Sequence, residues 1–208
     1  MTGVQTCALP IFALVNGTHL MAAYGALAVA DTARLQRAAL IATAMSIDAC
    51  RATSEFLDPR LHEARGQPGP EAVAEALAGL LENSQIIPSH RDHDPRVQDP
   101  YSIRCAPAVL GAAFDGLGYV KQAVAAELGA VTDNPLVFAG AGDEGPAILS
   151  GGNFHGMPIA LPLDTMAIAL THIAGISERR TFHMLSAFDA ESHLPPGNRR
   201  CGHGSWRN

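Results

Sequence analysis

The sequence predicts an all-α protein in which long helices pack side by side as a bundle, with one small β-hairpin. Alanine is abundant and has the highest helix propensity of the amino acids. Two long stretches, 19–54 and 158–188, are rich in apolar residues. In the stretches expected to be helical, apolar side chains recur in steps of three and four, as they do where helices pack together.

The composition limits the classes of function that the chain can have. The 208 residues suffice for one sizeable domain or for part of a larger protein. The chain is 48% hydrophobic and 16% charged, as in soluble globular proteins, and its aromatic content of 5% implies an aliphatic core. The formal net charge is −6 and no basic stripe occurs, so nucleic acid is not expected as a partner. No apolar run reaches membrane-spanning length, so no membrane partner is expected either.

Cysteine and histidine do not form a ligand pattern. The four cysteines are scattered without a C-x-x-C pair, which predicts neither zinc nor a disulfide framework. His90 and His93 lie three apart, but proline and aspartate surround them. We interpret this stretch as a solvated connection, with a metal site as the alternative. The leader lacks a positively charged region, so a cytoplasmic, reducing location is expected.

The stretch from His19 to about Ser54, where Gly25 is the only breaker, is expected to form one long helix or two helices stacked end to end. A break follows over residues 56–62 and a turn over 66–70. A short helix is then expected from Glu71 to Glu82. One apolar face of that helix comprises Val73, Ala76, Leu77 and Leu80.

Residues 83–97 read as a charged loop that leads into another helix. Asp99 is suited to be the N-cap of that helix, and Pro100 its first residue. Pro107 predicts a kink. The helix would end at Asp133-Asn134-Pro135. Its apolar seam comprises Leu110, Ala113, Leu117, Val120, Val124 and Leu128.

The last third predicts a hairpin and a second long helix. Residues 136–138 and 147–149 are apolar and flank the glycine-rich stretch 140–146, which is typical of a β-hairpin with an exposed tip. The helix is expected from Pro158 to about Phe188. Its stripe comprises Ile159, Leu163, Met166, Leu170 and Ile173.

Tyr101 and Arg104 are three apart and would share one face of a helix's first turn. A guanidinium can hold a carboxylate with two parallel hydrogen bonds, and a phenol can pass a proton or bond a reacting group. This pair suits a small acid as ligand. On spacing alone, however, an ordinary surface tyrosine and arginine on a capped helix explain the pattern equally well.

Five short motifs, in this order along the chain, change that balance. They are Leu14-Val15-Asn16-Gly17-Thr18, Gln98-Asp99-Pro100-Tyr101-Ser102-Ile103-Arg104-Cys105, Thr132-Asp133-Asn134-Pro135-Leu136, Ser150-Gly151-Gly152-Asn153-Phe154-His155-Gly156 and Ile176-Ser177-Glu178-Arg179-Arg180. Together they resemble the aromatic amino-acid ammonia-lyase family, most closely its histidine-specific members. The resemblance runs from about Ala13 to Pro196.

The resemblance implies a long-helix bundle of the ammonia-lyase and fumarase-like type, assembled as a homotetramer whose active sites draw on several subunits. The implied reaction converts L-histidine to trans-urocanate and ammonia without metal or nucleotide. It also implies a methylidene-imidazolone (MIO) group, formed from an internal Ala-Ser-Gly. That tripeptide does not occur in this sequence. The family's catalytic tyrosine loop and ring-binding glutamate also have no counterpart here, so the chain alone is expected to be inactive.

The resemblance also assigns roles to six residues. Tyr101 is the catalytic residue, placed beside the electrophile. The substrate-binding residues are Asn16, Arg104 and Gln98, with Arg104 as the carboxylate clamp. Asn153 and Phe154 belong to the surroundings of the prosthetic group. For Asn16 a turn residue before Gly17, and for Phe154 an ordinary core position, are the alternatives.

Other polar groups are expected to be structural. Glu178, Arg179 and Arg180 are interpreted as an ion-pair cluster between helices. His155 and His193 are interpreted as packing groups or as groups that support the site from behind.

Residues 12–196 are expected to be a partial helical core domain. Residues 1–11 resemble a translated sequencing adapter, and residues 197–208 a tail foreign to the family. Within the family, the form of the motif at 98–105 and the segment 62–67 favour histidine over tyrosine or phenylalanine, whose ammonia-lyases and aminomutases are the alternatives. A non-catalytic helical oligomerisation scaffold is the alternative from another class.

Overall fold

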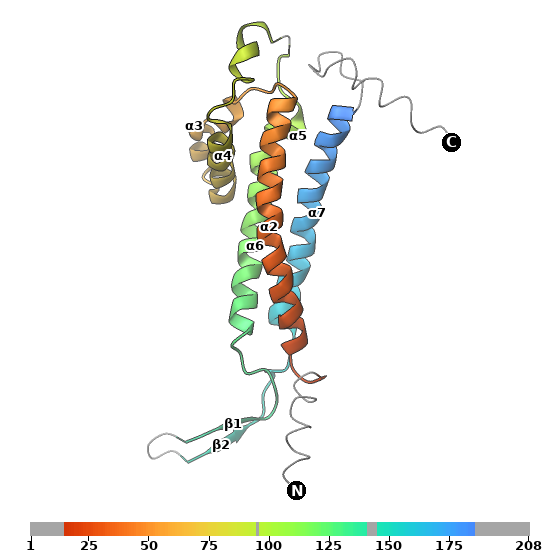
Figure 1. The fold of residues 1–208 in the computed structure, drawn as a ribbon. Helices are drawn as coiled ribbons and strands as arrows, with labels where there is room; N and C mark the ends of the chain where they lie inside the picture. Colours follow the sequence, from red (N-terminus) through yellow and green to blue (C-terminus); the bar gives the residue numbers. More distant parts are fainter. Residues whose placement is uncertain (1–14, 95, 141–144, 186–208) are drawn as a thin grey trace, which may run out of the picture. The chain divides into compact units, whose positions relative to one another are not determined.

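The computed structural model describes residues 15–94, 96–140 and 145–185 (Figure 1). The chain divides into two compact units, which we describe separately. Unit 1 comprises the described part of Met1–Thr32 together with Leu117–Ala167, and unit 2 comprises Ala33–Gly116 with the described residues from Ile168 onward. The expected leader 1–11 and tail 197–208 lie outside the described residues. The prediction of an all-α protein with one β-hairpin is confirmed.

Three long helices contribute to both units: α2 (His19–Ala49), α6 (Ala106–Glu127) and α7 (Met157–Leu185). The first predicted helix is confirmed as a single element, but it ends five residues before Ser54. It ends because Arg51 adopts a left-handed conformation with φ of 48°. Such a conformation is uncommon for a residue with a side chain and cannot continue an α-helix.

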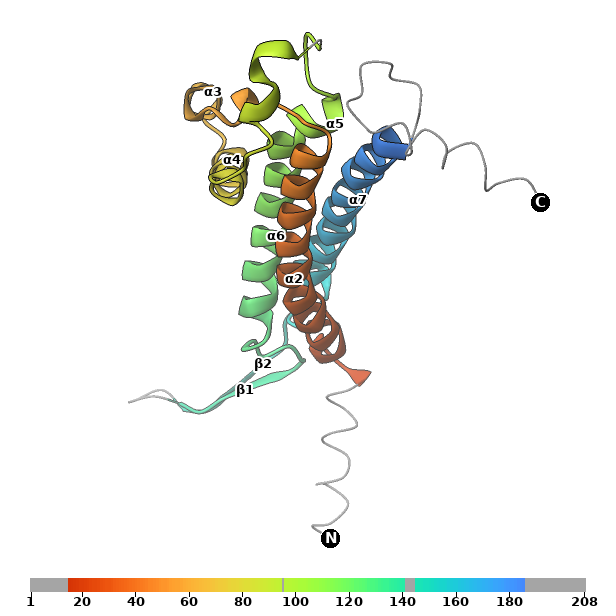
Figure 2. The same cartoon turned by 45° about the horizontal axis from the view of Figure 1, so that its top comes forward.

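In unit 1, segments of these three helices lie side by side (Figures 1 and 2). A Cβ atom at Gly25 would lie 3.2 Å from Val124, 3.4 Å from Leu163 and 3.7 Å from Ile159. Gly25 therefore does not break α2; it lets the other two helices approach closely. The buried apolar residues of this core are Ala22, Leu117, Val120, Val124, Ile159 and Met166. The predicted seam is confirmed except at Leu128, which is exposed beyond the end of α6.

In unit 2 the remaining parts of the long helices contribute a second core. Its buried apolar residues on those helices are Ala39, Ala44, Ile47, Ala106, Leu110, Ala113, Ala169, Ile173 and Ile176. The 3-10 turn η1 (Glu55–Leu57), α3 (Pro59–Arg65) and α4 (Pro68–Leu81) pack on one another. The start of α4 lies against α6, because the Gly69 amide donates to Asp115 at 3.1 Å. A Cβ atom at Gly111 would lie 2.1 Å from the Pro70 nitrogen, so the two backbones touch there.

The apolar face predicted for α4 is partly wrong. Val73 and Leu77 are buried, but Ala74 and Leu81 complete the face instead of Ala76 and Leu80, and Leu80 is 52% exposed. The reason is the start of the helix. Because α4 begins at Pro68 and its first turn is pressed against α6, the buried face is rotated relative to the one that an isolated repeat indicates.

The connection before the site motif contains more structure than a solvated loop. A 3-10 helix, η2 (Pro88–His93), occupies its middle, and His90 is only 3% exposed. The solvated interpretation is therefore wrong for His90, whose ring bonds the Ile86 carbonyl at 2.9 Å. The described residues hold no group of three His, Cys, Asp or Glu side chains that could bind a metal ion.

Where a kink near Pro107 was expected, the helix is instead interrupted two residues earlier. The single-turn helix α5 (Tyr101–Arg104) ends at Cys105, and α6 begins at Ala106. After α6, β1 (Leu136–Phe138) and β2 (Ala147–Leu149) form the predicted antiparallel hairpin, with Val137 opposite Ile148. Four residues of its tip, 141–144, lie outside the described residues.

Helix α7 is long enough and apolar enough to cross a membrane by length and composition, contrary to our expectation. Its stripe nevertheless packs inside the protein, because Ile159, Met166 and Ile173 are each at most 5% exposed. Pro162, within the helix, is also buried. This burial pattern is that of a core helix in a bundle.

Candidate functional site

Helix α5, in unit 2, presents Tyr101 and Arg104 outward and buries the two residues between them. Ile103 is fully buried and Ser102 is 8% exposed, whereas Tyr101 is 74% exposed. Tyr101 lines a hollow of about 740 Å³, together with His172 and Ile176 of α7. The buried Ser102 and Ile103 hold the helix in place. The exposed Tyr101 and Arg104 can therefore contact a ligand.

Arg104 lines a different hollow, of about 700 Å³, together with His62 and Arg65 of α3. Tyr101 and Arg104 thus line different hollows of unit 2. Positions three apart on a helix differ by about 60° around its axis, and here they lie on either edge of the outward face. Gln98 lines both hollows.

Asp99 is not the N-cap of α5, and this prediction is wrong. Pro100 occupies the cap position, and no side chain caps the helix. The Asp99 carboxylate instead accepts hydrogen bonds from the Thr53 amide at 2.9 Å and the Thr53 hydroxyl at 2.5 Å. Thr53 lies 46 residues earlier in the chain. The Asp99 side chain thus makes this tertiary contact instead of the expected N-cap hydrogen bond to the start of α5.

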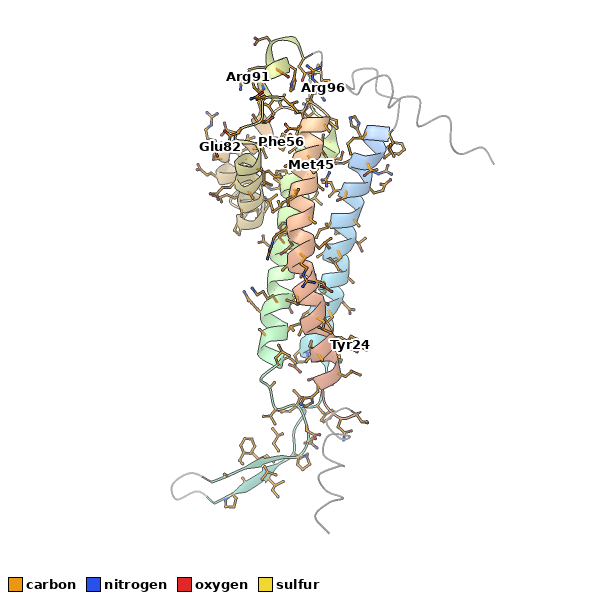
Figure 3. All side chains as sticks on the ribbon, in the orientation of Figure 1. Tyr24, Met45, Phe56, Glu82, Arg91 and Arg96 are labelled. Atoms are coloured by element: carbon orange, nitrogen blue, oxygen red, sulfur yellow. The ribbon has the colours of Figure 1, made fainter. Side chains whose placement is uncertain are left out.

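Arg96 satisfies backbone carbonyls just beyond the end of α2 (Figure 3). Its guanidinium donates to the Cys50 carbonyl at 3.1 Å and to the Arg51 carbonyl. It also pairs with the Asp94 carboxylate through two nitrogens, at 3.2 and 3.0 Å, and lies 3.6 Å from the Asp99 carboxylate. The Arg96 side chain is only 4% exposed.

Arg180 and Cys50 are buried neighbours of this region. Burial raises the pKa of the Cys50 thiol to about 11, although the positive charge of Arg96 opposes the shift. Burial lowers the pKa of Arg180, which donates to the Ser177 hydroxyl at 3.1 Å. The predicted cluster of ion pairs between helices is wrong. Glu178 and Arg179 pair with each other on the surface of α7, and Arg180 points inward.

In unit 1, the loop of Asn16, Gly17 and Thr18 is held against Thr132. Gly17 has φ of +73°, and a Cβ atom there would lie 1.9 Å from the Thr132 carbonyl oxygen. The Thr18 amide donates to the Thr132 hydroxyl at 3.3 Å, and the Thr18 hydroxyl donates to the Glu127 carboxylate. Asn16 is itself exposed, so its side chain is presented on an anchored loop.

The other two motifs of unit 1 are joined in the same way. The Asn134 side-chain oxygen accepts from the Gly151 amide at 2.7 Å and from the Ser150 hydroxyl at 3.2 Å. The Asn153 side chain donates to the Val131 carbonyl at 3.5 Å. The segment 131–134 thus contacts both the Asn16 loop and the glycine-rich segment.

Phe154 and His155 are both exposed. Phe154 is 50% exposed, which does not fit the alternative of an ordinary core residue. The Nδ1 atom of the exposed His155 accepts from the Met157 amide at 3.1 Å, where α7 begins. His155 therefore caps a helix; His193 lies outside the described residues.

The six predicted site residues fall into two groups. Asn16, Asn153 and Phe154 belong to unit 1, and Gln98, Tyr101 and Arg104 belong to unit 2. All six are exposed. Sequence reasoning missed the residues that hold them. Thr18 and Thr132 stand inside the recognised motifs and could have been suspected, whereas Thr53, Arg96 and Glu127 gave no local signal.

The helical core, together with an Asn-Gly-Thr loop, a Tyr–Arg turn and a glycine-rich segment, defines the ammonia-lyase class of protein. The chain belongs to the aromatic amino acid lyase family, whose profile matches residues 10–197.

Histidine ammonia-lyases are among the similar sequences. The one from Anaeromyxobacter sp. strain K is 46% identical over 185 residues, covering 88% of this chain, and that from Gloeobacter violaceus is 44% identical over 183 residues. The chain spans only about a third of their length, 35% and 34% respectively.

The fold is similar to solved structures of the same class. Histidine ammonia-lyase from Trypanosoma cruzi has a TM-score of 0.74 and 39% identity, with 88% of this chain and 32% of that chain covered. Phenylalanine aminomutase from Pantoea agglomerans has a TM-score of 0.77 and 28% identity, with 89% and 38% covered.

Proposed function

We propose that the chain is part of a histidine ammonia-lyase, which removes ammonia from the α-carbon and hydrogen from the β-carbon of L-histidine to give trans-urocanate. This proposal rests on the order of the sequence identities between this chain and its relatives. The histidine ammonia-lyase structure is 39% identical to this chain, whereas the phenylalanine and tyrosine aminomutase structures are 28–30% identical. The curated histidine ammonia-lyases reach 46%.

In this proposal Arg104 holds the substrate carboxylate, because a guanidinium can form two parallel hydrogen bonds to it. Gln98 lines both hollows and adds a hydrogen bond to the substrate. Tyr101 passes a proton or bonds the reacting group through its hydroxyl. The exposure of Tyr101 supports a site that other parts of the polypeptide, or another subunit, complete.

Asn16, Asn153 and Phe154 would surround the prosthetic group, with Asn16 also reaching the substrate carboxylate and Phe154 keeping water away. The group supplies an electrophile that activates the amine as a leaving group. Its Ala-Ser-Gly precursor is absent from the 208 residues, so this chain cannot form it. We therefore assign only binding, proton transfer and positioning to the residues of this chain, with proton transfer assigned to Tyr101.

We also propose that the intact enzyme is a cytoplasmic homotetramer that acts on a free amino acid. Large apolar side chains remain exposed along α2, and burying the exposed part of each would contribute a share of the about 1.5–3 kcal/mol that full burial of such a side chain gives. They are Leu20, Tyr24, Leu27, Leu35, Ile41 and Met45. Such a set suits contact with further long helices better than contact with water.

A chimera tests the reaction. The segment of the Anaeromyxobacter enzyme that matches this chain would be replaced by the corresponding residues of this chain, so that the remaining length comes from the relative. We expect urocanate to form from L-histidine, with no comparable conversion of L-tyrosine or L-phenylalanine. A folded chimera that prefers either of those would contradict the histidine assignment, and one that deaminates none would favour the non-catalytic scaffold. The 208-residue chain alone should form no urocanate.

A further inference from the structure

We infer that Asp99 and Arg96 are positioning residues that fasten the segment bearing Gln98, Tyr101 and Arg104 to the end of α2. That the positioned residues bind a substrate rests on the proposed function. The positioning itself is argued only from contacts within unit 2. Neither side chain needs to touch the substrate for this role.

Asp99 is fixed from two sides. Its side chain is 3% exposed, one carboxylate oxygen accepts both hydrogen bonds from Thr53, and the other lies 3.6 Å from the Arg96 guanidinium. Hydrogen bonds to a charged group are about twice as strong as those between neutral groups. A buried carboxylate with these partners holds its backbone in one place.

Pro100 transmits this placement to α5. It is the only residue between Asp99 and Tyr101, and its ring fixes φ, which is −52° here. The chain therefore has one fewer soft torsion between the anchored carboxylate and the tyrosine. A shift of Asp99 would move Tyr101 and the turn that follows it.

Arg96 anchors the other side of Gln98. Its guanidinium bonds the carbonyls of Cys50 and Arg51, the residues that follow α2. Arg51 has the left-handed φ of 48°, a conformation that is unfavourable for a residue with a side chain. The hydrogen bond to its carbonyl helps to hold that conformation.

Gln98 thus lies between two anchored residues. Val97, beside it, is 96% exposed and contributes no burial of its own. The contacts of Arg96 and Asp99 are therefore what fixes the backbone on both sides of Gln98, whose side chain lines both hollows.

The first test is independent of catalysis and uses the 208-residue chain. Thr53→Val removes the hydroxyl donor with little change of shape, and Asp99→Asn removes the charge. Hydrogen exchange in the peptide covering residues 98–105 should accelerate about tenfold in each variant, the ratio expected for one lost hydrogen bond of about 1.4 kcal/mol. Exchange in residues 157–167 should not change. Asp92→Asn, the same charge loss on an exposed side chain of η2, is the control, and Thr53→Ser should fall between the parent and Thr53→Val.

The second test measures the kinetics of Asp99→Asn in the chimera. It separates positioning from simple loss of folded enzyme. A misplaced substrate-binding group raises KM for histidine as well as lowering kcat, with a combined loss on the order of 100-fold in kcat/KM. A variant that only reduces the amount of folded enzyme lowers the apparent kcat and leaves KM unchanged. Asp99→Glu, which keeps the charge, should recover part of the loss.

Unchanged exchange at residues 98–105 in Asp99→Asn, or a loss of activity with KM unchanged, would overturn the inference. If the parent chimera does not deaminate histidine while exchange still accelerates as described, the proposed function fails and the anchoring role stands.

Discussion

Gly17 and Thr132 lie so close that a Cβ atom on Gly17 would be 1.9 Å from the Thr132 carbonyl oxygen. Gly17 also has φ of +73°, where a side chain costs on the order of 1–2 kcal/mol. Gly17→Ala should therefore move the Asn16 loop away from Thr132. In the chimera we expect it to reduce kcat/KM for histidine at least tenfold, because Asn16 would no longer be held in place.

Gly66→Ala is the matched control for this prediction. Gly66 has a similar φ of +66°, but nothing lies within 4 Å of the position of its Cβ. Gly66→Ala should cost only the conformational strain and leave activity near that of the parent. Equal losses in the two variants would show that strain, rather than the contact with Thr132, determines the effect.

The sequence predicted the long helices well because their signal is repeated over many residues. Individual apolar positions were predicted less well where a neighbouring element decided them. Leu80 is exposed and Leu81 buried because the first turn of α4 is pressed against α6. The spacing within α4 carries no information about that contact.

The polar contacts of the site could not be predicted for the same reason. The sequence Asp99-Pro100 is typical of a helix start, yet Asp99 bonds Thr53, which no local pattern connects to it. Arg180 stands beside Glu178 and Arg179 in the sequence, but helical geometry turns it inward while they stay outside. The motifs indicated which exposed residues to propose as the site; the contacts that anchor their segments required the tertiary structure.

Leu117→Asp should destabilise the protein strongly, because Leu117 is 3% exposed in the seam of α6. An unpaired charge there has no partner, and we expect a loss of about 4 kcal/mol or more in the free energy of unfolding. Lys121→Asp, on the exposed side of the same helix, should change it by no more than about 0.5 kcal/mol. Urea unfolding followed by circular dichroism measures both. Equal effects would show that the seam is not part of the core.

The Cys50 thiol should make stability decrease at alkaline pH. Its pKa is raised to about 11 in the folded protein, whereas an unfolded thiol ionises near about 8.5. Between these values the unfolded chain has lost the proton that the folded chain retains, so the free energy of unfolding falls as pH rises from about 9 to 11. Cys50→Ala should weaken this dependence, which thermal unfolding across that range would reveal.

The carboxylate clamp is tested by Arg104→Lys in the chimera. Lysine keeps the charge but cannot form the two parallel hydrogen bonds of a guanidinium. Because the substrate carboxylate persists through the reaction, its binding contributes to both the ground state and the transition state. We therefore expect KM for histidine to rise, and kcat/KM to fall on the order of 100-fold if the substrate is also misplaced.

Arg37→Lys is the control for this substitution, because Arg37 is exposed on α2 and carries no proposed role. It should leave kcat/KM within about twofold of the parent, since surface substitutions rarely change stability by more than about 0.5 kcal/mol. Steady-state kinetics with urocanate absorbance as the readout would compare the two. If Arg104→Lys and Arg37→Lys behave alike, Arg104 does not hold the carboxylate. The hollow that it shares with His62 and Arg65 would then have no part in substrate binding.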